Sequence, residues 1–176
     1  MTNTNTPPAG NISAAPRYKA RWLTVCGFLM AMNTVLSSFS IPVPGGHFYL
    51  NDVIIVAAAL SLDPLGAFLV GGVGAFLGGL FFCSLATHGL KSVVISLFAR
   101  RYGKKNLLLT FFGVFLGALI VVVGYSLGRA YIYSTPEYSL IKLPFEILQA
   151  GIGAILGAFI WKNRNMGDII RKIISK

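Results

Sequence analysis

Apolar stretches of roughly 20 residues recur along this chain, and that length constrains the fold more than any other feature. A helix of about 20 apolar residues crosses the hydrocarbon core of a bilayer, which is about 30 Å thick. Of the 176 residues, 55% are hydrophobic and 11% are charged, whereas soluble domains carry about 25% charged residues. This charge is too sparse to cover a water-facing surface. The sequence therefore predicts an integral membrane protein in contact with the lipid bilayer.

The apolar segments predict an all-α fold, a compact six-transmembrane-helix bundle. Pro and Gly at residues 41–46 end the first helix, and Asp63 before Pro64 predicts an N-cap for the third. The second segment is short, so it must borrow from its flanks, tilt, or lie partly inside the bundle. The predicted spans are residues 22–39, 53–62, 65–82, 87–99, 107–127 and 143–161.

The 15 Lys and Arg residues outnumber the 5 Asp and Glu residues, which gives a net charge of +10. In a soluble protein this excess would suggest nucleic-acid binding. Here the basic residues gather beside predicted spans, where positive charge sets topology, so no nucleic-acid partner is expected. Most of them fall before residue 22, at residues 100–105, or after residue 161. The positive-inside rule therefore predicts that both termini are cytoplasmic.

The two ends of the chain differ from its apolar middle. Residues 1–16 are polar and lack the pattern of a signal peptide, so they predict a disordered cytoplasmic tail. Residues 17–162 predict the six-helix membrane domain. Residues 163–176 predict a basic cytoplasmic C-terminal tail that includes a short interfacial helix. No second, soluble domain is expected.

Polar side chains within the spans predict where a ligand binds, because such groups are costly in lipid and usually face a cavity or a partner. In the predicted topology they gather near the outer face, while the inner halves of the spans are almost purely apolar. This asymmetry predicts an outward-opening pocket rather than a continuous channel. The candidate binding residues are His47, Tyr49, Asn51, Asp52, His88, Lys91, Tyr125, Glu146 and Gln149.

Several of these residues also have a structural interpretation. Asn51 and Asp52 either cap the second span or bind a ligand. Lys91 and Arg129 either extend to the outer interface or enter the site. Glu146 suits the positive end of a helix dipole near the start of the sixth span, and it is also able to pair with Lys91 or Arg129.

Two further patterns predict packing rather than ligand binding. Small residues spaced by four in the third and fifth spans predict close helix packing. A phosphate-binding loop is excluded, because no Gly-Lys-Ser/Thr follows these glycines. The segment 129–142 is rich in tyrosine and predicts a loop whose Tyr131, Tyr133 and Tyr138 form an aromatic belt at the interface.

The sequence offers no catalytic or metal-binding pattern: it has no His-Glu-x-x-His and no glycine-bracketed nucleophile. Cys26 and Cys83 lie in apolar segments and predict buried thiols rather than a disulfide framework or a metal site. No metal and no enzyme activity are therefore expected. A self-sufficient secondary transporter or channel, a membrane enzyme and a structural membrane protein stay as alternatives to a binding subunit.

Several motifs follow one another along the chain in a characteristic order. They are the pair Gly27 and Ala31, His47-Phe-Tyr-Leu-Asn-Asp52, Asp63-Pro64-Leu65-Gly66-Ala67, His88-Gly89 and Leu143-Pro144-Phe145-Glu146-Ile147-Leu148-Gln149-Ala150. This order resembles the substrate-binding S components of energy-coupling factor (ECF) transporters. The likeness is greatest to the branch associated with hydroxymethylpyrimidine and pyridoxine-type vitamins, and it covers nearly the whole chain after residue 20. Relatives often have Lys-Gly where this chain has His-Gly, and a Pro-rich outer loop where residues 82–87 are expected to make a short connection.

This resemblance implies a mechanism. S components bind a vitamin from outside the bacterial cytoplasmic membrane and associate with a membrane coupling protein and two cytoplasmic ATPase subunits. ATP is used by those partners, so this chain is expected to have neither a cofactor nor an ATPase site. Gly27 and Ala31 are implied to pack against the coupling protein, and the S component is thought to topple with its ligand. A small heteroaromatic ring would stack on Tyr49 or Tyr125, with the polar candidates bonding to its substituents.

Overall fold

The computed structural model describes residues 16–44, 46–79, 82–103, 105–163 and 166–175. The predicted N-terminal tail lies outside these residues except for Pro16, which opens the first helix. In chain order the elements are α1 (Pro16–Ser38), β1 (Ser40–Val43), β2 (Gly46–Tyr49), α2 (Asn51–Ser61), α3 (Pro64–Phe68), η1 (Leu69–Val73), α4 (Gly74–Gly79), α5 (Phe82–Arg101), α6 (Leu107–Gly128), η2 (Arg129–Tyr133), α7 (Pro136–Asn163) and α8 (Met166–Ser175).

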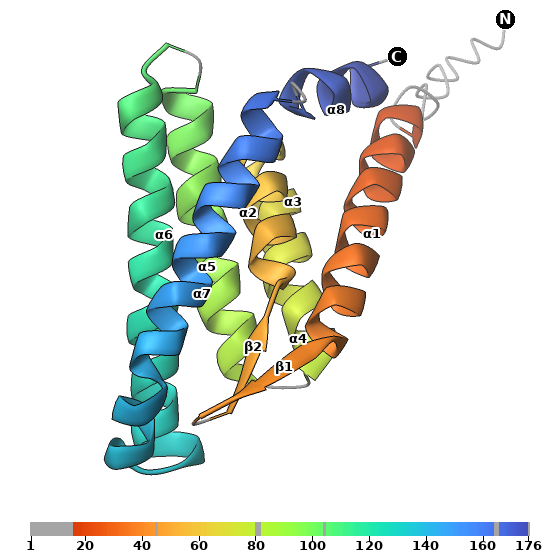
Figure 1. Cartoon of the computed structure of the whole chain (residues 1–176). Coiled ribbons are helices and arrows are strands. Elements are labelled where there is room, and N and C mark those ends of the chain that lie inside the picture. Colours follow the sequence, from red (N-terminus) through yellow and green to blue (C-terminus); the bar gives the residue numbers. More distant parts are fainter. Residues whose placement is uncertain (1–15, 45, 80–81, 104, 164–165, 176) are drawn as a thin grey trace, which may run out of the picture.

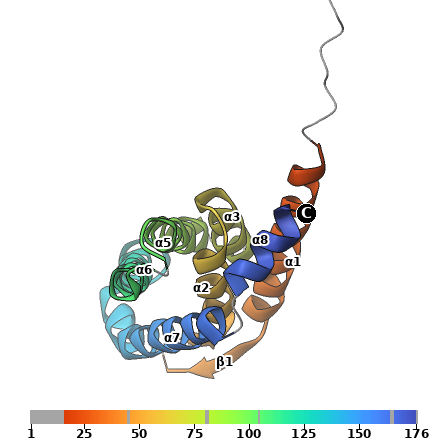
Figure 2. The ribbon, with the colours of Figure 1, turned by 90° about the horizontal axis from the view of Figure 1, so that it is seen from above.

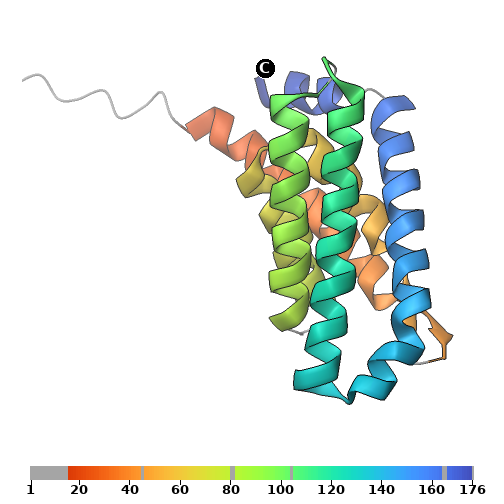
Figure 3. The same cartoon turned by 90° about the vertical axis from the view of Figure 1, so that its left-hand side faces the viewer.

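The helices run roughly alongside one another, with the β1–β2 hairpin near one end of the bundle and α8 lying across the other (Figure 1). These two ends are called the hairpin end and the α8 end below. Seen along the bundle, α5, α6 and α7 follow one another around one side, and α1 lies on the opposite side (Figure 2). Figure 3 shows α5, α6 and α7 side by side. Helix α2 packs against α1, α5 and α7 and forms the centre.

Three helical segments of the described chain are long and apolar enough to cross a membrane: Phe82–Arg101, Leu107–Tyr133 and Pro136–Asn163. Two shorter apolar segments, Asn51–Ser61 and Pro64–Gly79, lie among them. The all-α membrane architecture agrees with the sequence. Six spans with both termini in the cytoplasm stay a prediction.

Helix α2 lies inside the bundle, which is one of the three possibilities expected for the short second segment. Ile55, Val56, Ala57, Ala58 and Ala59 are each at most 1% exposed. A short helix that is apolar on every side is stable where other helices surround it. Its position brings its first turn to the middle of the hairpin end.

The third predicted span is helical but interrupted, because the π-helix η1 separates α3 from α4. A π segment leaves backbone carbonyls without their regular partners. The Asn33 side chain of α1 donates to the carbonyl of Val70 in η1 at 2.6 Å, and Thr34 donates to the carbonyl of Gly74 at 3.1 Å. At the start of α3, the Asp63 carboxylate accepts from the Gly66 N–H at 3.5 Å, so the predicted N-cap is confirmed.

The glycines predicted to pack helices closely do so. A Cβ on Gly71 would overlap the Ser92 side chain in α5, and one on Gly74 would lie 2.7 Å from the side chain of Asn33. In α6, a Cβ on Gly117 would lie 2.7 Å from the side chain of Ile95 in α5. Small residues therefore let η1 and α4 fit between α1 and α5, and let α6 lie against α5.

Two predicted boundaries are wrong. Helix α5 begins at Phe82, so residues 82–87 are helical rather than a connection, and His88 lies well inside the helix. The segment 129–142 is not a loop, because η2 continues α6 and α7 begins at Pro136, which places Pro144 inside α7. The missed signal was Thr135 before Pro136: its hydroxyl accepts from the Tyr138 N–H at 3.4 Å, as a capping residue does.

The C-terminal tail forms the predicted short helix, α8 (Met166–Ser175). Its Ile170 and Ile174 side chains are buried against a cluster that includes Cys26 and Leu62, while Ile169 and Ile173 are about half exposed. The helix thus docks on the bundle by one face and leaves apolar side chains on the other, as helices at a membrane interface do.

Candidate functional site

A cavity of about 220 Å³ opens at the hairpin end and is called the polar cavity below. Residues of α1, β2, α2, α4, α5, α6, η2 and α7 line it. Because α2 is short and central, its first turn lies on the side of the cavity that faces the interior of the bundle. The lining residues are Ser37, Tyr49, Asn51, Ala75, Gly78, Gly79, Cys83, His88, Val121, Tyr125, Arg129, Tyr133, Lys142, Glu146 and Gln149.

Beneath the polar cavity lies a buried ion pair between α2 and α5. The Lys91 ammonium donates to Oδ1 of Asp52 at 2.7 Å, and both side chains are 1% exposed. Nδ1 of His88 lies 3.3 Å from the same oxygen. A charged pair sealed from water is stable when each charge compensates the other. The pair therefore fixes α2 against α5 and holds His88 at the floor of the cavity.

Helices α5 and α6 supply an aromatic wall. The Tyr125 ring meets the His88 ring edge-on, with centroids 5.4 Å apart, and the Tyr125 hydroxyl is hydrogen-bonded to the Ser84 hydroxyl. The Tyr133 hydroxyl, which belongs to another residue of the lining, accepts from the Cys83 N–H at 3.3 Å. An aromatic ring bound here would find an edge or a face of Tyr125.

A second buried ion pair joins η2 to α7. Arg129 Nη2 lies 2.6 Å from Oε1 of Glu146, and the Ser126 hydroxyl donates to Oε2 at 3.2 Å. The Ser139 hydroxyl donates to the Ser126 carbonyl at 2.9 Å and ties the start of α7 to the end of α6. Both carboxylate oxygens of Glu146 are therefore engaged by protein groups.

The hairpin closes one side of the cavity. The Tyr49 N–H donates to Oε1 of Gln149 in α7 at 3.0 Å, and burial raises the pKa of the Tyr49 hydroxyl above its ordinary value, so this group stays neutral. Gly46 has φ +139°, and a Cβ there would lie 3.2 Å from Nζ of Lys142. Glycine thus suits both the turn and its close approach to the lysine.

Polar atoms are left without partners at this site. Four buried atoms have no hydrogen-bond partner within the described part of the protein: Oδ1 of Asn51, Nη1 of Arg129 and Nδ1 of His88 in residues that line the cavity, and Oδ2 of Asp52 beneath it. The Asn51 amide nitrogen is used, since it donates to the Ser37 hydroxyl at 2.9 Å. Buried polar groups are nearly always paired, so these atoms are best explained by a bound molecule or water that supplies the missing partners. The structure therefore shows a cavity with an unmet acceptor and an unmet donor.

The structure brings most of the predicted binding residues together. Asp52 and Lys91 lie under the cavity rather than in its lining. His47 is exposed, and its ring centroid is 6.3 Å from that of Tyr49, outside the lining. The residues that line it as expected are Tyr49, Asn51, His88, Tyr125, Glu146 and Gln149.

The structural interpretations of these residues are also resolved. Capping of α2 by Asn51 and Asp52 is wrong, because its N-cap is Leu50 and no side chain caps it. Extension of Lys91 to the interface is wrong, because its charge is neutralised by Asp52. The pairing of Glu146 with Arg129 is confirmed.

Sequence reasoning missed part of the lining. Ser37 and Cys83 are contributed by α1 and by the first turn of α5, neither of which was expected near the site. Arg129 was left between the interface and the site, and Lys142 was not among the candidates. Because the segment 129–142 was interpreted as a loop, nothing indicated that the Lys142 side chain turns inward. The Thr135 cap was the signal that would have corrected this.

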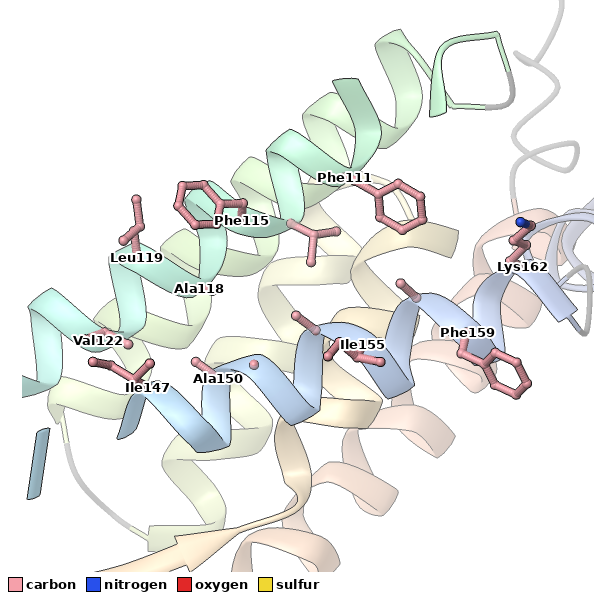
Figure 4. Close-up of a pocket in the computed structure, with 14 residues that line it drawn as sticks. Phe111, Phe115, Ala118, Leu119, Val122, Ile147, Ala150, Ile155, Phe159 and Lys162 are labelled. Atoms are coloured by element: carbon pink, nitrogen blue, oxygen red, sulfur yellow. The ribbon is translucent and has the colours of Figure 1, made fainter. Parts of the chain in front are cut away.

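A larger hollow of about 680 Å³ lies elsewhere, between α6 and α7, and is called the apolar groove below (Figure 4). Its walls include Phe115, Leu119 and Ile155, and Lys162 lies at one end. Its lining otherwise carries no polar side chain. Such a groove on the outside of a membrane bundle is suited to acyl chains of lipid, and it offers no group to orient a polar ligand.

Two small residues lie on an open face of α1. A Cβ on Gly27 would meet no other atom within 4 Å, and Ala31 is exposed. Larger apolar side chains on the same helix, Phe28 and Val35, are more than half exposed. This face of α1 is therefore largely exposed in the described chain.

A comparison against protein families identifies the class of this membrane protein. A family model described as ECF-type riboflavin transporter, S component, matches residues 17–165. No curated protein matches the chain. The matched residues span most of the protein, so the chain belongs to this family of multi-pass membrane proteins. It is therefore a vitamin-binding subunit of an ECF transporter, and not an enzyme.

Proposed function

We propose that the polar cavity captures a small vitamin or vitamin precursor with a single heteroaromatic ring, of which hydroxymethylpyrimidine and pyridoxine are the leading candidates. The observation that carries this proposal is the pair of unpartnered atoms, Asn51 Oδ1 and Arg129 Nη1, in a cavity that also has the aromatic rings of Tyr125 and Tyr49. A ring with polar substituents fits such a site, because the rings offer stacking and the free atoms fix orientation.

The size of the cavity supports a single ring. Pockets for drug-sized molecules usually measure about 300–1,000 Å³. The polar cavity measures about 220 Å³, which is below that range. Riboflavin, after which the family model is named, has three fused rings and a ribityl chain. Riboflavin is the alternative to a single-ring ligand, and its larger size would require the hairpin to move away from α7.

The expected orientation follows from the position of the cavity. The hairpin end would face outward, where the vitamin arrives, and the basic α8 end would face the cytoplasm. The open face of α1 at Gly27 and Ala31 would dock on a membrane coupling protein, which two cytoplasmic ATPases power. In this division of labour the present chain supplies binding and its partners supply the energy.

Calorimetry on the detergent-purified protein tests the ligand. Hydroxymethylpyrimidine, pyridoxine and riboflavin are titrated separately, and we expect one single-ring compound to bind while riboflavin does not. Tight binding of riboflavin alone would contradict the single-ring proposal. Failure of all three to bind would contradict the assignment of this cavity as a vitamin site.

Uptake by vesicles tests the docking face. Gly27→Leu should abolish ATP-dependent uptake in vesicles that contain the partner subunits but leave vitamin binding unchanged, because its side chain would project where no atom of this chain lies. Gly151→Leu is the matched control, since Gly151 is also helical and open, and it should leave uptake intact. Normal uptake by Gly27→Leu would exclude this face of α1 as the docking surface.

A further inference from the structure

The polar cavity holds more positive charge than its acidic residues balance. Two cations, Arg129 and Lys142, line it together with one carboxylate, Glu146. The charges beneath the cavity cancel, because Lys91 pairs with Asp52. The cavity therefore carries one positive charge in excess.

The carboxylate of Glu146 is already committed to the protein. Its Oε1 pairs with Arg129 Nη2 at 2.6 Å, and its Oε2 accepts from Ser126 at 3.2 Å. Each oxygen of Glu146 therefore already has a protein donor. Arg129 keeps Nη1 buried and without a partner in the described residues, so the donor that stays available belongs to the cation of the pair.

Lys142 supplies the excess charge. Its residue is 8% exposed, and its ammonium makes no hydrogen bond or ion pair with any described residue. It interacts electrostatically with both Arg129 and Glu146, so it shares the cavity with that pair. The turn of the hairpin at Gly46 lies over it. Glu146 is already paired with Arg129, so the Lys142 ammonium has no carboxylate of its own, and a bound anion would compensate its charge.

We propose that the polar cavity recognises its single-ring ligand through an anionic oxygen group held between Arg129 and Lys142. This inference rests on the proposed function and narrows the substrate class to rings that carry a carboxylate or an ionised ring hydroxyl. Arg129 Nη1 and Lys142 Nζ donate to that group, while Asn51 Oδ1 accepts from a donor elsewhere on the ligand. Of the two leading candidates, the inference favours the pyridine, which has an acidic ring hydroxyl, over the aminopyrimidine.

Matched pairs of ligands test the charge. Binding to the purified protein is measured for a pyridine carboxylate and its carboxamide, and for pyridoxine and its ring-hydroxyl methyl ether. The first pair reports a carboxylate and the second an ionised hydroxyl. We expect the anionic member of at least one pair to bind about tenfold tighter or more than its neutral partner.

The same titrations on Lys142→Met identify the group that reads the charge. The anionic ligand should lose about tenfold in affinity or more, and the neutral member should change by less than about twofold. Lys142→Arg keeps the charge and should retain the preference. Lys142→Met should fold at least as well as the wild type, because it removes a buried charge that has no protein partner.

The outcomes separate this inference from the proposed function. Equal affinity for the members of both pairs, or an equal loss for both members in Lys142→Met, would overturn the inference and leave a single-ring site. Binding of hydroxymethylpyrimidine in preference to every anion would do the same. Failure of the wild-type protein to bind any single-ring compound would overturn the proposed function as well.

Discussion

The polar cavity and the apolar groove are two hollows of this protein, and the smaller one has the more polar lining. The groove measures about 680 Å³ and the cavity about 220 Å³. The cavity nevertheless has two ion pairs in its lining or floor, together with four buried atoms that lack a hydrogen-bond partner in the described residues, while the groove has Lys162 at one end and apolar walls. In a membrane protein a large apolar hollow faces lipid, so the unmet polar groups mark the site better than volume does.

The largest effect is expected from the ion pair under the cavity. Lys91→Met should lower the free energy of unfolding by about 3–5 kcal/mol, because it leaves the buried Asp52 charge uncompensated. The thermal midpoint in detergent should fall by roughly 6 °C or more. The double variant Asp52→Asn with Lys91→Met should recover most of this loss. A single variant as stable as the wild type would show that the pair does not hold α2 against α5.

A smaller but specific effect is expected on ligand binding. His88→Ala and Gln149→Ala should each weaken binding roughly 5- to 150-fold, since each leaves a polar group of the ligand or protein unpaired at a cost of about 1–3 kcal/mol. Calorimetry measures this, with the thermal midpoint as a check on folding. Wild-type affinity in both variants would remove the polar cavity from consideration as the binding site.

Gly46 tests the contribution of the hairpin. Gly46→Ala should cost on the order of 1–3 kcal/mol, because φ is +139° there and the new Cβ would press on Lys142. Gly151→Ala provides the opposite control: this glycine is helical with open space around it, so alanine should stabilise by about 0.5–1 kcal/mol. If the two substitutions change the thermal midpoint alike, the hairpin turn is not constrained as the structure shows.

The smallest effect is expected in the apolar groove. Ile155 is 70% exposed, so Ile155→Ala should change ligand affinity and stability by less than about 0.5 kcal/mol. Titration of the vitamin into this variant checks the claim that the groove plays no part in its recognition. A loss of binding comparable to that of Gln149→Ala would place the ligand between α6 and α7.

The sequence predicts the helical framework because its dominant signals are local. Apolar length identifies the spans, small residues at four-residue spacing identify the contact faces, and Asp63 identifies a cap. The π segment η1 was beyond reach, because it depends on Asn33 donating to Val70 from a different helix. The β1–β2 hairpin was hidden by the prolines that ended the first span, which indicated a turn without showing the pairing of Ser40 with Tyr49.

The sequence predicted which residues form the site better than it predicted what each of them does. Tyr49, Asn51, His88, Tyr125 and Gln149 do meet in the cavity, as the rule that polar groups in spans face a common space leads one to expect. The pairing of the charged residues was not predictable, since it depends on which carboxylate each cation reaches across the bundle. That geometry placed Lys91 in the floor with Asp52 and left Lys142 without a partner among the described residues.

Native mass spectrometry of the protein purified from cells grown in rich medium tests the central claim most directly. The account predicts one co-purified single-ring heteroaromatic molecule per chain, with occupancy strongly reduced in Gln149→Ala and unchanged in Ile155→Ala. A flavin mass in the wild-type protein, or a small molecule whose occupancy depends on Ile155 and not on Gln149, would contradict it.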